Sequence, residues 1–277
     1  MNILQDIPVA ESLNFADVAV NYIHFDSRKV EQGDIFIAVK GSLTDGHNFI
    51  DAAIAQGASA IICEQIPESA TSKNGPVYIR VEDSHEALGK AASNYFDRPS
   101  EKIQLVGVTG TNGKTTVVTL LFQLFGSLGY NTGLLSTIEN KIDDQVFPAT
   151  HTTPDPVKIN ELLSQMVTQK VSYCFMEVSS HAIHQKRISG LHFDGAIFTN
   201  ITQDHLDYHH TFKNYLYAKK ALFDTLPAGS WALVNADDKN GKVMMQNTKA
   251  RKHSFGLQTA ADFKTKIIEN RVEGLHL

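Results

Sequence analysis

The segment that most constrains the fold is residues 106–116, VGVTGTNGKTT, where an apolar run passes through a glycine-rich turn into a helical pattern. Backbone N–H groups in such a turn point at phosphate oxygens, Lys114 can reach the terminal phosphates, and the Thr115 hydroxyl can ligate magnesium. The segment therefore predicts a nucleoside triphosphate site. The residues expected to bind the nucleotide are Gly110, Thr111, Asn112, Gly113, Lys114, Thr115 and Thr116.

The residues after this turn predict a helix. The apolar residues that recur at helical spacing are Leu120, Leu121, Leu124, Phe125 and Leu128. Gly129 is a typical helix end.

The turn is a variant of the common phosphate-binding loop. The common pattern has a glycine five residues before Gly113, where this chain has Val108, and the glycines fall instead at positions 107, 110 and 113. An unliganded strand-turn-helix corner is the alternative interpretation. Such a corner gives no reason for a lysine and paired threonines at the start of the helix, so we favour a ligand.

Composition argues against several classes of protein. With 277 residues and 42% hydrophobic content the chain can bury a substantial core, and its length is typical of two domains. A net charge of −5 without a basic run argues against a nucleic acid partner. No apolar stretch is long enough to cross a membrane, and the first residues do not resemble a signal peptide. Cys63 and Cys174 adjoin apolar runs rather than forming a disulfide pattern, so we expect a cytoplasmic protein.

The chain divides most naturally at the polar, proline-containing stretch 97–102. Before it, the apolar runs 35–39, 60–63 and 77–81 alternate with the helix-like segments 47–57 and 84–96, which predicts a small α/β domain over residues 1–99. After it, the runs 173–176, 195–198 and 231–234 are apolar without alternation, as in parallel strands covered on both faces. We therefore predict a phosphate-loop-type, mainly parallel α/β domain over residues 100–277.

Polar residues gather where two of these apolar runs end. Glu177 directly follows the run 173–176, and six of the twelve histidines lie between positions 181 and 210. Because open parallel sheets bind ligands at the carboxyl ends of their strands, these residues are candidates for a site. Glu177 offers the hard oxygen that magnesium prefers, and His205 is the one imidazole that we retain as a candidate ligand of a second metal ion.

Zinc is the alternative occupant of the histidine-rich segment. His205 and His209 have the i, i+4 spacing of a helical zinc motif. Leu206, however, stands where a zinc protease would carry its glutamate, and no nearby cysteine adds a soft ligand. We therefore favour magnesium.

Several motifs, in one order along the chain, resemble the ATP-dependent Mur ligases. They are the loop GTNGKTT at 110–116, EVSSH at 177–181 followed by QKR at 185–187, TNITQDHLDYH at 199–209 and NADD at 235–238. The N-terminal part, with DSR at 26–28, GDIFIAVKG at 33–41 and DGH at 45–47, resembles the domain that binds the uridine nucleotide in that family. The resemblance covers essentially the whole chain and is strongest to the members that add the third residue of the peptidoglycan stem peptide.

The resemblance implies peptide-bond formation in two stages. ATP phosphorylates the terminal carboxylate of UDP-N-acetylmuramoyl-L-alanyl-D-glutamate, and the amine of a diamino acid, L-lysine or meso-diaminopimelate, then attacks the acyl phosphate. The first stage brings a carboxylate to a triphosphate, which explains the need for a lysine and magnesium ions. The implied partners are the UDP-sugar dipeptide, ATP and the diamino acid, and we expect the chain to be a monomer.

The resemblance also implies roles for individual residues. Thr115 and Glu177 match ligands of the magnesium ion on the triphosphate, and His205 matches a ligand of a second one. Lys219 matches a lysine that the family carries as a carbamate beside the second magnesium. With Lys114, the residues Glu177, His205 and Lys219 form the implied catalytic set. The implied substrate-binding residues are Ser27, Ser42, Thr44, Thr152, Thr153, Ser179, Gln185 and Arg187.

Ordinary structural roles are the alternatives for some of these residues. Lys219 and Lys220 fit two solvated charges on an amphipathic helix. Arg187 fits a surface residue, although its planar fork suits a carboxylate. Asp155 and Pro156 fit the cap and first position of a helix, and such a cap is compatible with neighbouring threonines that bind a ligand.

In the Mur ligases a third domain carries the amino-acid pocket. This chain stops at 271–277 in what reads as an unfinished strand pair of the central domain, so we expect that third domain to be absent. We then expect a fragment or short relative with little ligation of its own. A non-catalytic UDP-sugar- and ATP-binding module is one alternative. The ligase that adds the next dipeptide and a folylpolyglutamate synthetase are the others, and the SSH and DHLDYH strings at 179–181 and 204–209 favour neither.

Overall fold

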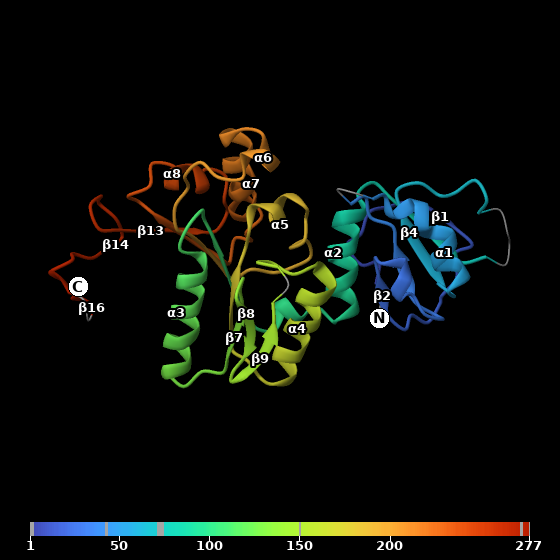
Figure 1. The fold of residues 1–277 in the computed structure, drawn as a ribbon, viewed down its shortest axis with the longest axis horizontal. Helices are drawn as coiled ribbons and strands as arrows, with labels where there is room; N and C mark the ends of the chain where they lie inside the picture. Colours follow the sequence, from blue (N-terminus) through green and yellow to red (C-terminus); the bar gives the residue numbers. More distant parts are fainter. Residues whose placement is uncertain (1–2, 42–43, 71–74, 150, 272–273, 277) are drawn as a thin grey trace. The chain divides into compact units, whose positions relative to one another are not determined.

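The computed structural model describes residues 3–41, 44–70, 75–149, 151–271 and 274–276. They form two compact units (Figure 1). The first comprises Met1–Pro99, Asp155–Ser164 and Gln185–Leu191, and the second comprises Ser100–Pro154, Gln165–His184 and His192–Leu277. No helix in the described ranges is both long and apolar enough to cross a lipid bilayer.

The first unit is built on a sheet with the strand order β1-β5-β4-β3-β2 among the described residues. Its strands are β1 (Val9–Leu13), β2 (Ile23–His24), β3 (Ile35–Ile37), β4 (Ala60–Cys63) and β5 (Val77–Val81). Its helices are α1 (Ile50–Ala55), α2 (Ser84–Tyr95) and the part of α4 (Pro156–Thr168) up to Ser164. It also contains the 3-10 helices Ser27–Lys29 and Gly46–Phe49. Strands β2 to β5 are parallel and β1 is antiparallel to β5. The predicted runs 60–63 and 77–81 are confirmed as strands, whereas the run 35–39 is a strand only over Ile35–Ile37. The predicted helices 84–96 and 47–57 are present as α2 and as the shorter α1.

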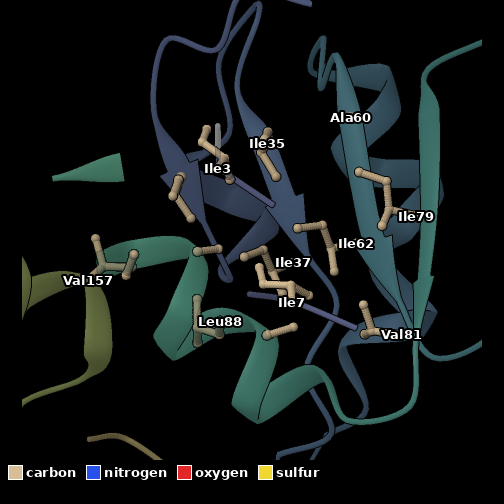
Figure 2. Close-up of a cluster of buried hydrophobic side chains, with 14 of the residues drawn as sticks. Ile3, Ile7, Ile35, Ile37, Ala60, Ile62, Ile79, Val81, Leu88 and Val157 are labelled. Carbon is tan, nitrogen blue, oxygen red and sulfur yellow. The ribbon is translucent and has the colours of Figure 1, made fainter. Parts of the chain in front are cut away.

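Side chains of successive strand residues enter two separate clusters, one on each face of this sheet. Ile35 and Ile37 of β3 pack in one cluster, whereas Phe36 between them packs in the other. Ile62 of β4 joins the first cluster with Leu88 of α2 (Figure 2). Both faces are therefore covered, which explains why these strands are apolar without alternation.

The second unit is built on a longer sheet with the order β14-β13-β12-β11-β6-β10-β7-β8-β9 among the described residues. Its strands are β6 (Gln104–Thr109), β7 (Thr132–Leu135), β8 (Glu139–Ile142), β9 (Gln145–Pro148), β10 (Tyr173–Glu177), β11 (Gly195–Phe198), β12 (Trp231–Asn235), β13 (Arg251–Gly256) and β14 (Phe263–Lys264). A separate antiparallel pair joins β15 (Glu269–Arg271) to β16 (Gly274–His276). Among the described strands of the long sheet, the pairs β7–β8 and β8–β9 are antiparallel and the other pairs are parallel. The prediction of a mainly parallel α/β fold is confirmed.

The helices of the second half of the chain are α3 (Lys114–Ser127), α4 (Pro156–Thr168), α5 (Ser180–His184), α6 (Leu206–His209), α7 (Phe212–Asp224) and α8 (Gly241–Met244). The predicted helix after the glycine-rich turn is α3, which ends before Gly129 at φ +90°. The predicted cap of α4 is also confirmed, because Asp155 Oδ1 accepts a hydrogen bond from Lys158 N at 2.9 Å.

Three neighbouring strands of the long sheet end at one level. Glu177, the last residue of β10, lies opposite Val108 of β6, and Phe198, the last residue of β11, lies opposite Thr109. The carboxyl ends of β6, β10 and β11 therefore open at the same edge of the sheet, which is where open parallel sheets bind ligands.

Candidate functional site

The glycine-rich turn joins β6 to α3, as predicted, and two glycines allow its shape. Gly113 precedes α3 with φ +83°, a conformation that other residues adopt only with strain. Gly110 has φ +154°, and a Cβ there would lie 1.9 Å from Thr199 Oγ1. The turn is held by the segment that follows β11: Asn112 N donates to Asn200 Oδ1 at 3.0 Å, and Thr111 N donates to Asn200 O at 2.8 Å.

Two lysine side chains meet at this turn. Lys114 Nζ donates to Gly110 O at 3.1 Å and to Thr111 O at 3.0 Å. Lys219 Nζ, from α7, donates to the same Gly110 O at 2.8 Å and lies 4.5 Å from the centre of the Tyr215 ring. Burial lowers the pKa of both lysines, and together with the positive charge of Lys114 it brings the pKa of Lys219 to about 7. Two amine groups thus lie at this turn, which suits it to an anion.

Lys219 and its neighbour Lys220 are both buried, with 2% and 1% exposure. The interpretation of the pair as solvated surface charges is therefore wrong. Lys220 Nζ forms an ion pair with Asp224 at 2.6 Å, whereas Lys219 Nζ donates to Gly110 O in the glycine-rich turn. The two adjacent lysines thus have different roles.

Glu177 is fully buried, with 0% exposure, at the end of β10. Its carboxylate accepts hydrogen bonds from Thr137 N at 2.7 Å and from Thr137 Oγ1 at 3.2 Å. The negative charge of Glu177 opposes the lowering of the pKa of Lys114, so the two groups are electrostatically coupled. Thr137 is a residue that the sequence did not indicate, because it is 40 positions away and belongs to none of the motifs.

His205 lies at the start of α6 in a left-handed conformation, with φ +50°. Its side chain is 46% exposed, and its Nε2 is 3.5 Å from Asp204 Oδ2. The His205 ring lies 6.1 Å from the Tyr215 ring, whose hydroxyl pairs with Thr111 Oγ1 at 3.0 Å. Tyr215 therefore has a ring contact with His205 and a hydrogen bond to the glycine-rich turn. Asp204 and Tyr215 could have been identified from the sequence, since both lie within or close to the histidine-rich motif.

Four of the six clustered histidines come together in space. His181 lies 4.8 Å from His205 and 5.5 Å from His209, measured between ring centres, and His184 lies 5.8 Å from His209. His209 is buried and its Nε2 pairs with Ser180 Oγ at 3.0 Å. Burial, with the nearby histidines, lowers the pKa of His209 to about 4, so this imidazole is neutral at physiological pH.

No group of three or more histidine, cysteine, aspartate or glutamate side chains is arranged to hold a metal ion in the part of the chain that the structure describes. The zinc alternative therefore has no support from the geometry. The candidate magnesium ligands to consider are the Thr115 hydroxyl, the Glu177 carboxylate and, once modified, the Lys219 amine.

Thr153 and Ser179 are linked to each other beside Glu177. Thr153 Oγ1 donates to Glu177 O at 2.9 Å and accepts from Ser179 N at 3.1 Å. Ser179 Oγ accepts from Ala182 N at 3.1 Å, at the start of α5. Thr153 is buried, and Thr152 is half-buried. These hydroxyls thus stabilise the loop that follows β10.

The remaining predicted substrate residues belong to the first unit. Arg187 donates to Gln185 Oε1 through Nε at 2.9 Å and through Nη2 at 2.6 Å. Ser27 is buried in the 3-10 helix Ser27–Lys29, and Thr44 is exposed. Ser42 lies outside the described residues.

Two family models match most of the chain. One described as the Mur ligase middle domain matches residues 108–277, and one described as the Mur ligase family, catalytic domain, matches residues 19–96.

Curated relatives resemble nearly all of this chain. It is 57% identical to the UDP-N-acetylmuramoyl-L-alanyl-D-glutamate--2,6-diaminopimelate ligase of Cytophaga hutchinsonii over 261 residues, which are 94% of this chain and 54% of the relative. Identity to the ligase of the same name from Bacteroides fragilis is 51%, over 99% of this chain and 56% of the relative. The chain thus spans about half the length of the curated relatives that it matches.

Solved structures show the same fold. A structure of a UDP-N-acetylmuramoyl-L-alanyl-D-glutamate--2,6-diaminopimelate ligase superposes with a TM-score of 0.79 at 29% identity, covering 92% of this chain and 52% of the other. The MurF ligase of Thermotoga maritima, solved with ADP, superposes with a TM-score of 0.59 at 23% identity, covering 88% of this chain and 52% of the other.

Proposed function

We propose, from the premise that this chain belongs to the Mur ligase family, that it carries the UDP-sugar-binding and ATP-binding parts of an ATP-dependent, ADP-forming ligase of peptidoglycan synthesis. Residues 1–99 would bind the UDP-sugar and residues 100–277 would bind ATP. The observation that carries the proposal is that Lys114 Nζ and Lys219 Nζ both donate hydrogen bonds to Gly110 O. The buried Glu177 acts electrostatically on Lys114. Lys114 provides a cation for a polyanion such as a triphosphate, whereas Lys219, with its pKa lowered to about 7, is available for modification.

The proposed reaction activates a carboxyl group. The terminal carboxylate of UDP-N-acetylmuramoyl-L-alanyl-D-glutamate attacks the γ-phosphorus of ATP, ADP leaves, and an acyl phosphate forms. The amine of a diamino acid then attacks the acyl carbon and phosphate leaves. Lys114 would offset the negative charge that accumulates when a carboxylate approaches a triphosphate, and this effect is strongest at a partly buried site.

Two magnesium ions would supply further neutralisation of the phosphate charge. The available groups fit hard cations: Thr115 offers a hydroxyl and Glu177 a buried carboxylate for one ion, and His205 and a carbamate on Lys219 would hold the other. A carbamate forms when a neutral lysine amine adds to carbon dioxide and loses a proton. The pKa of Lys219, lowered to about 7, supports this modification because much of the amine is neutral at physiological pH.

The substrate assignments follow the family motifs. We assign Ser27, Ser42 and Thr44 to the uridine nucleotide, and Thr152, Thr153, Ser179, Gln185 and Arg187 to the muramoyl dipeptide. We propose 2,6-diaminopimelate rather than L-lysine as the added amino acid, since the similar curated relatives carry that name. The protein would act in the cytoplasm as a monomer.

Calorimetry tests the proposal directly. We expect the chain to bind UDP-N-acetylmuramoyl-L-alanyl-D-glutamate more tightly than UDP, and to bind ATP in the presence of magnesium. Failure to bind either the sugar dipeptide or ATP contradicts the proposal. Amide formation with 2,6-diaminopimelate, assayed on the product of the complete reading frame that contains this chain, then separates a ligase from a non-catalytic binding module.

A further inference from the structure

The segment Gln185–Leu191 follows α5 in the sequence but belongs to the first unit, where it lies along α2. A Cβ on Gly89 of α2 would lie 2.6 Å from Ser189 O, so the two backbones approach as closely as glycine allows. Gly190 has φ +79°, and a Cβ there would lie 2.9 Å from Lys90 Cα. Ser93 Oγ donates to Gly190 O at 2.9 Å. One end of the segment is thus fixed against the middle of α2.

Lys186 fixes the other end of the segment. Its Nζ lies 2.7 Å from Asp83 Oδ2 and 2.7 Å from Glu86 Oε2, the two carboxylates at the start of α2. Asp83 is also the cap of this helix, because its side chain accepts from Glu86 N at 2.9 Å. Lys186 has φ +54°, a conformation that a lysine adopts at a cost, so its placement is held by the surroundings.

The residues on both sides of Lys186 are the predicted dipeptide-binding residues. Gln185 Oε1 accepts two hydrogen bonds from the Arg187 guanidinium, which holds the two side chains together. Because Lys186 is bonded to α2, the backbone on either side of it is fixed to the same helix. A planar guanidinium recognises a carboxylate through paired hydrogen bonds only when its orientation is set.

We propose that Lys186 is a positioning residue: by bridging Asp83 and Glu86 at the start of α2, it orients the Gln185–Arg187 pair toward the acidic, peptide end of the ligand. This inference rests on the proposed function. It assigns to the half-exposed ion-pair bridge of Lys186 the discrimination between a UDP-sugar that carries the acidic dipeptide and one that does not. Ser27 and Thr44, which we assign to the uridine nucleotide, are not among the residues that Lys186 contacts.

The test compares two ligands on three forms of the chain by calorimetry. Lys186→Met should weaken binding of UDP-N-acetylmuramoyl-L-alanyl-D-glutamate by about three- to tenfold, as expected for a half-exposed ion-pair bridge. Binding of UDP should be unchanged. The matched control is Lys90→Met, which removes another cation from Glu86, at 2.8 Å, and leaves Lys186 with both carboxylates. This control should bind both ligands as the wild type does.

A second pair of variants separates positioning from folding. Lys186→Arg should restore most of the lost affinity, and Asp83→Asn, which retains a capping side chain, should reproduce part of the loss. Equal weakening of both ligands, or wild-type behaviour of Lys186→Met, overturns the inference alone. A wild-type chain that does not prefer the dipeptide ligand to UDP overturns the proposed function and this inference with it.

Discussion

Lys114 and Lys219 donate hydrogen bonds to the same oxygen, the carbonyl of Gly110, at 3.1 and 2.8 Å. The positive charge of Lys114 is one reason why the pKa of Lys219 is lowered to about 7, after burial itself. The nearby negative groups that act on Lys114 are Glu177 and Asp204, and they offset the effect of burial only in part. A bound triphosphate would relieve the repulsion between the two lysines.

Replacing Lys114 should therefore weaken nucleotide binding without unfolding the protein. We expect Lys114→Met to bind ATP and magnesium about 10- to 100-fold more weakly, the range for a lost hydrogen bond to a charged group. The melting temperature should not fall, because burial disfavours this charge in the folded state. Calorimetry and thermal melting measure the two effects, and the exposed Lys213→Met of α7 is the control. Equal nucleotide affinity in Lys114→Met and wild type would contradict the proposal.

Lys219 should take up carbon dioxide. With ¹³C-bicarbonate at pH 8, we expect a carbamate signal in the carbon NMR spectrum of the wild type, and a weaker signal at pH 6 because the amine is then mostly protonated. Lys219→Met should lack the signal, whereas Lys213→Met, changed on the exposed side of the same helix, should keep it. A signal that survives in Lys219→Met would assign the modification to another amine.

Glu177 should link nucleotide binding to magnesium. In Glu177→Gln we expect ATP to bind with nearly the same affinity with and without magnesium, because an amide is a weak ligand for this ion. Thr137→Val, which removes only the 3.2 Å bond from Thr137 Oγ1, should retain most of the magnesium dependence. Titration of ATP into each variant with magnesium or with EDTA provides the measurement. An undiminished magnesium effect in Glu177→Gln would exclude Glu177 as a ligand.

His209 should make stability sensitive to acid. Its pKa is lowered to about 4 in the folded protein from an ordinary value of 6.5, so between these pH values the unfolded chain binds a proton that the folded chain does not. The stability that this neutral imidazole provides is complete above about pH 6.5 and is lost as the pH falls toward 4. We expect the advantage of wild type over His209→Gln in melting temperature to shrink by a few degrees from pH 7 to pH 5. A difference in melting temperature between the two proteins that stays constant from pH 7 to pH 5 would contradict this prediction.

The parallel core of the fold could be predicted from the sequence because its strands are continuous apolar runs. Cys174, Phe175 and Met176 of β10 are buried on both faces, and no polar residue interrupts them. The antiparallel strands could not be predicted, because they lack such continuous apolar runs. In β8, Asn140 and Ile142 are buried while Glu139 and Lys141 are half-buried, so this short polar strand carries no apolar run.

The phosphate loop could be predicted because its residues are adjacent in the chain. The burial of Lys219 could not, since a lysine pair on a helix usually faces solvent. The two lysines are distinguished by their contacts, Lys219 with Gly110 O and Lys220 with Asp224, and neither contact is visible in the sequence. The attachment of Gln185–Leu191 to α2 depends on Gly89 and Gly190, whose close approach leaves no pattern in the sequence. Sequence motifs thus do not indicate contacts between residues that are distant in the chain.

The most direct test of the central claim is a crystal structure of the chain with magnesium and a non-hydrolysable ATP analogue. We predict that the β- and γ-phosphates lie within hydrogen-bond distance of the backbone N–H groups of Gly113, Lys114 and Thr115, since those of Thr111 and Asn112 already donate to Asn200. Lys114 Nζ should be displaced from Gly110 O onto the phosphate oxygens. A structure in which this turn holds no phosphate, and Lys114 and Lys219 both remain on Gly110 O at saturating nucleotide, would contradict the account.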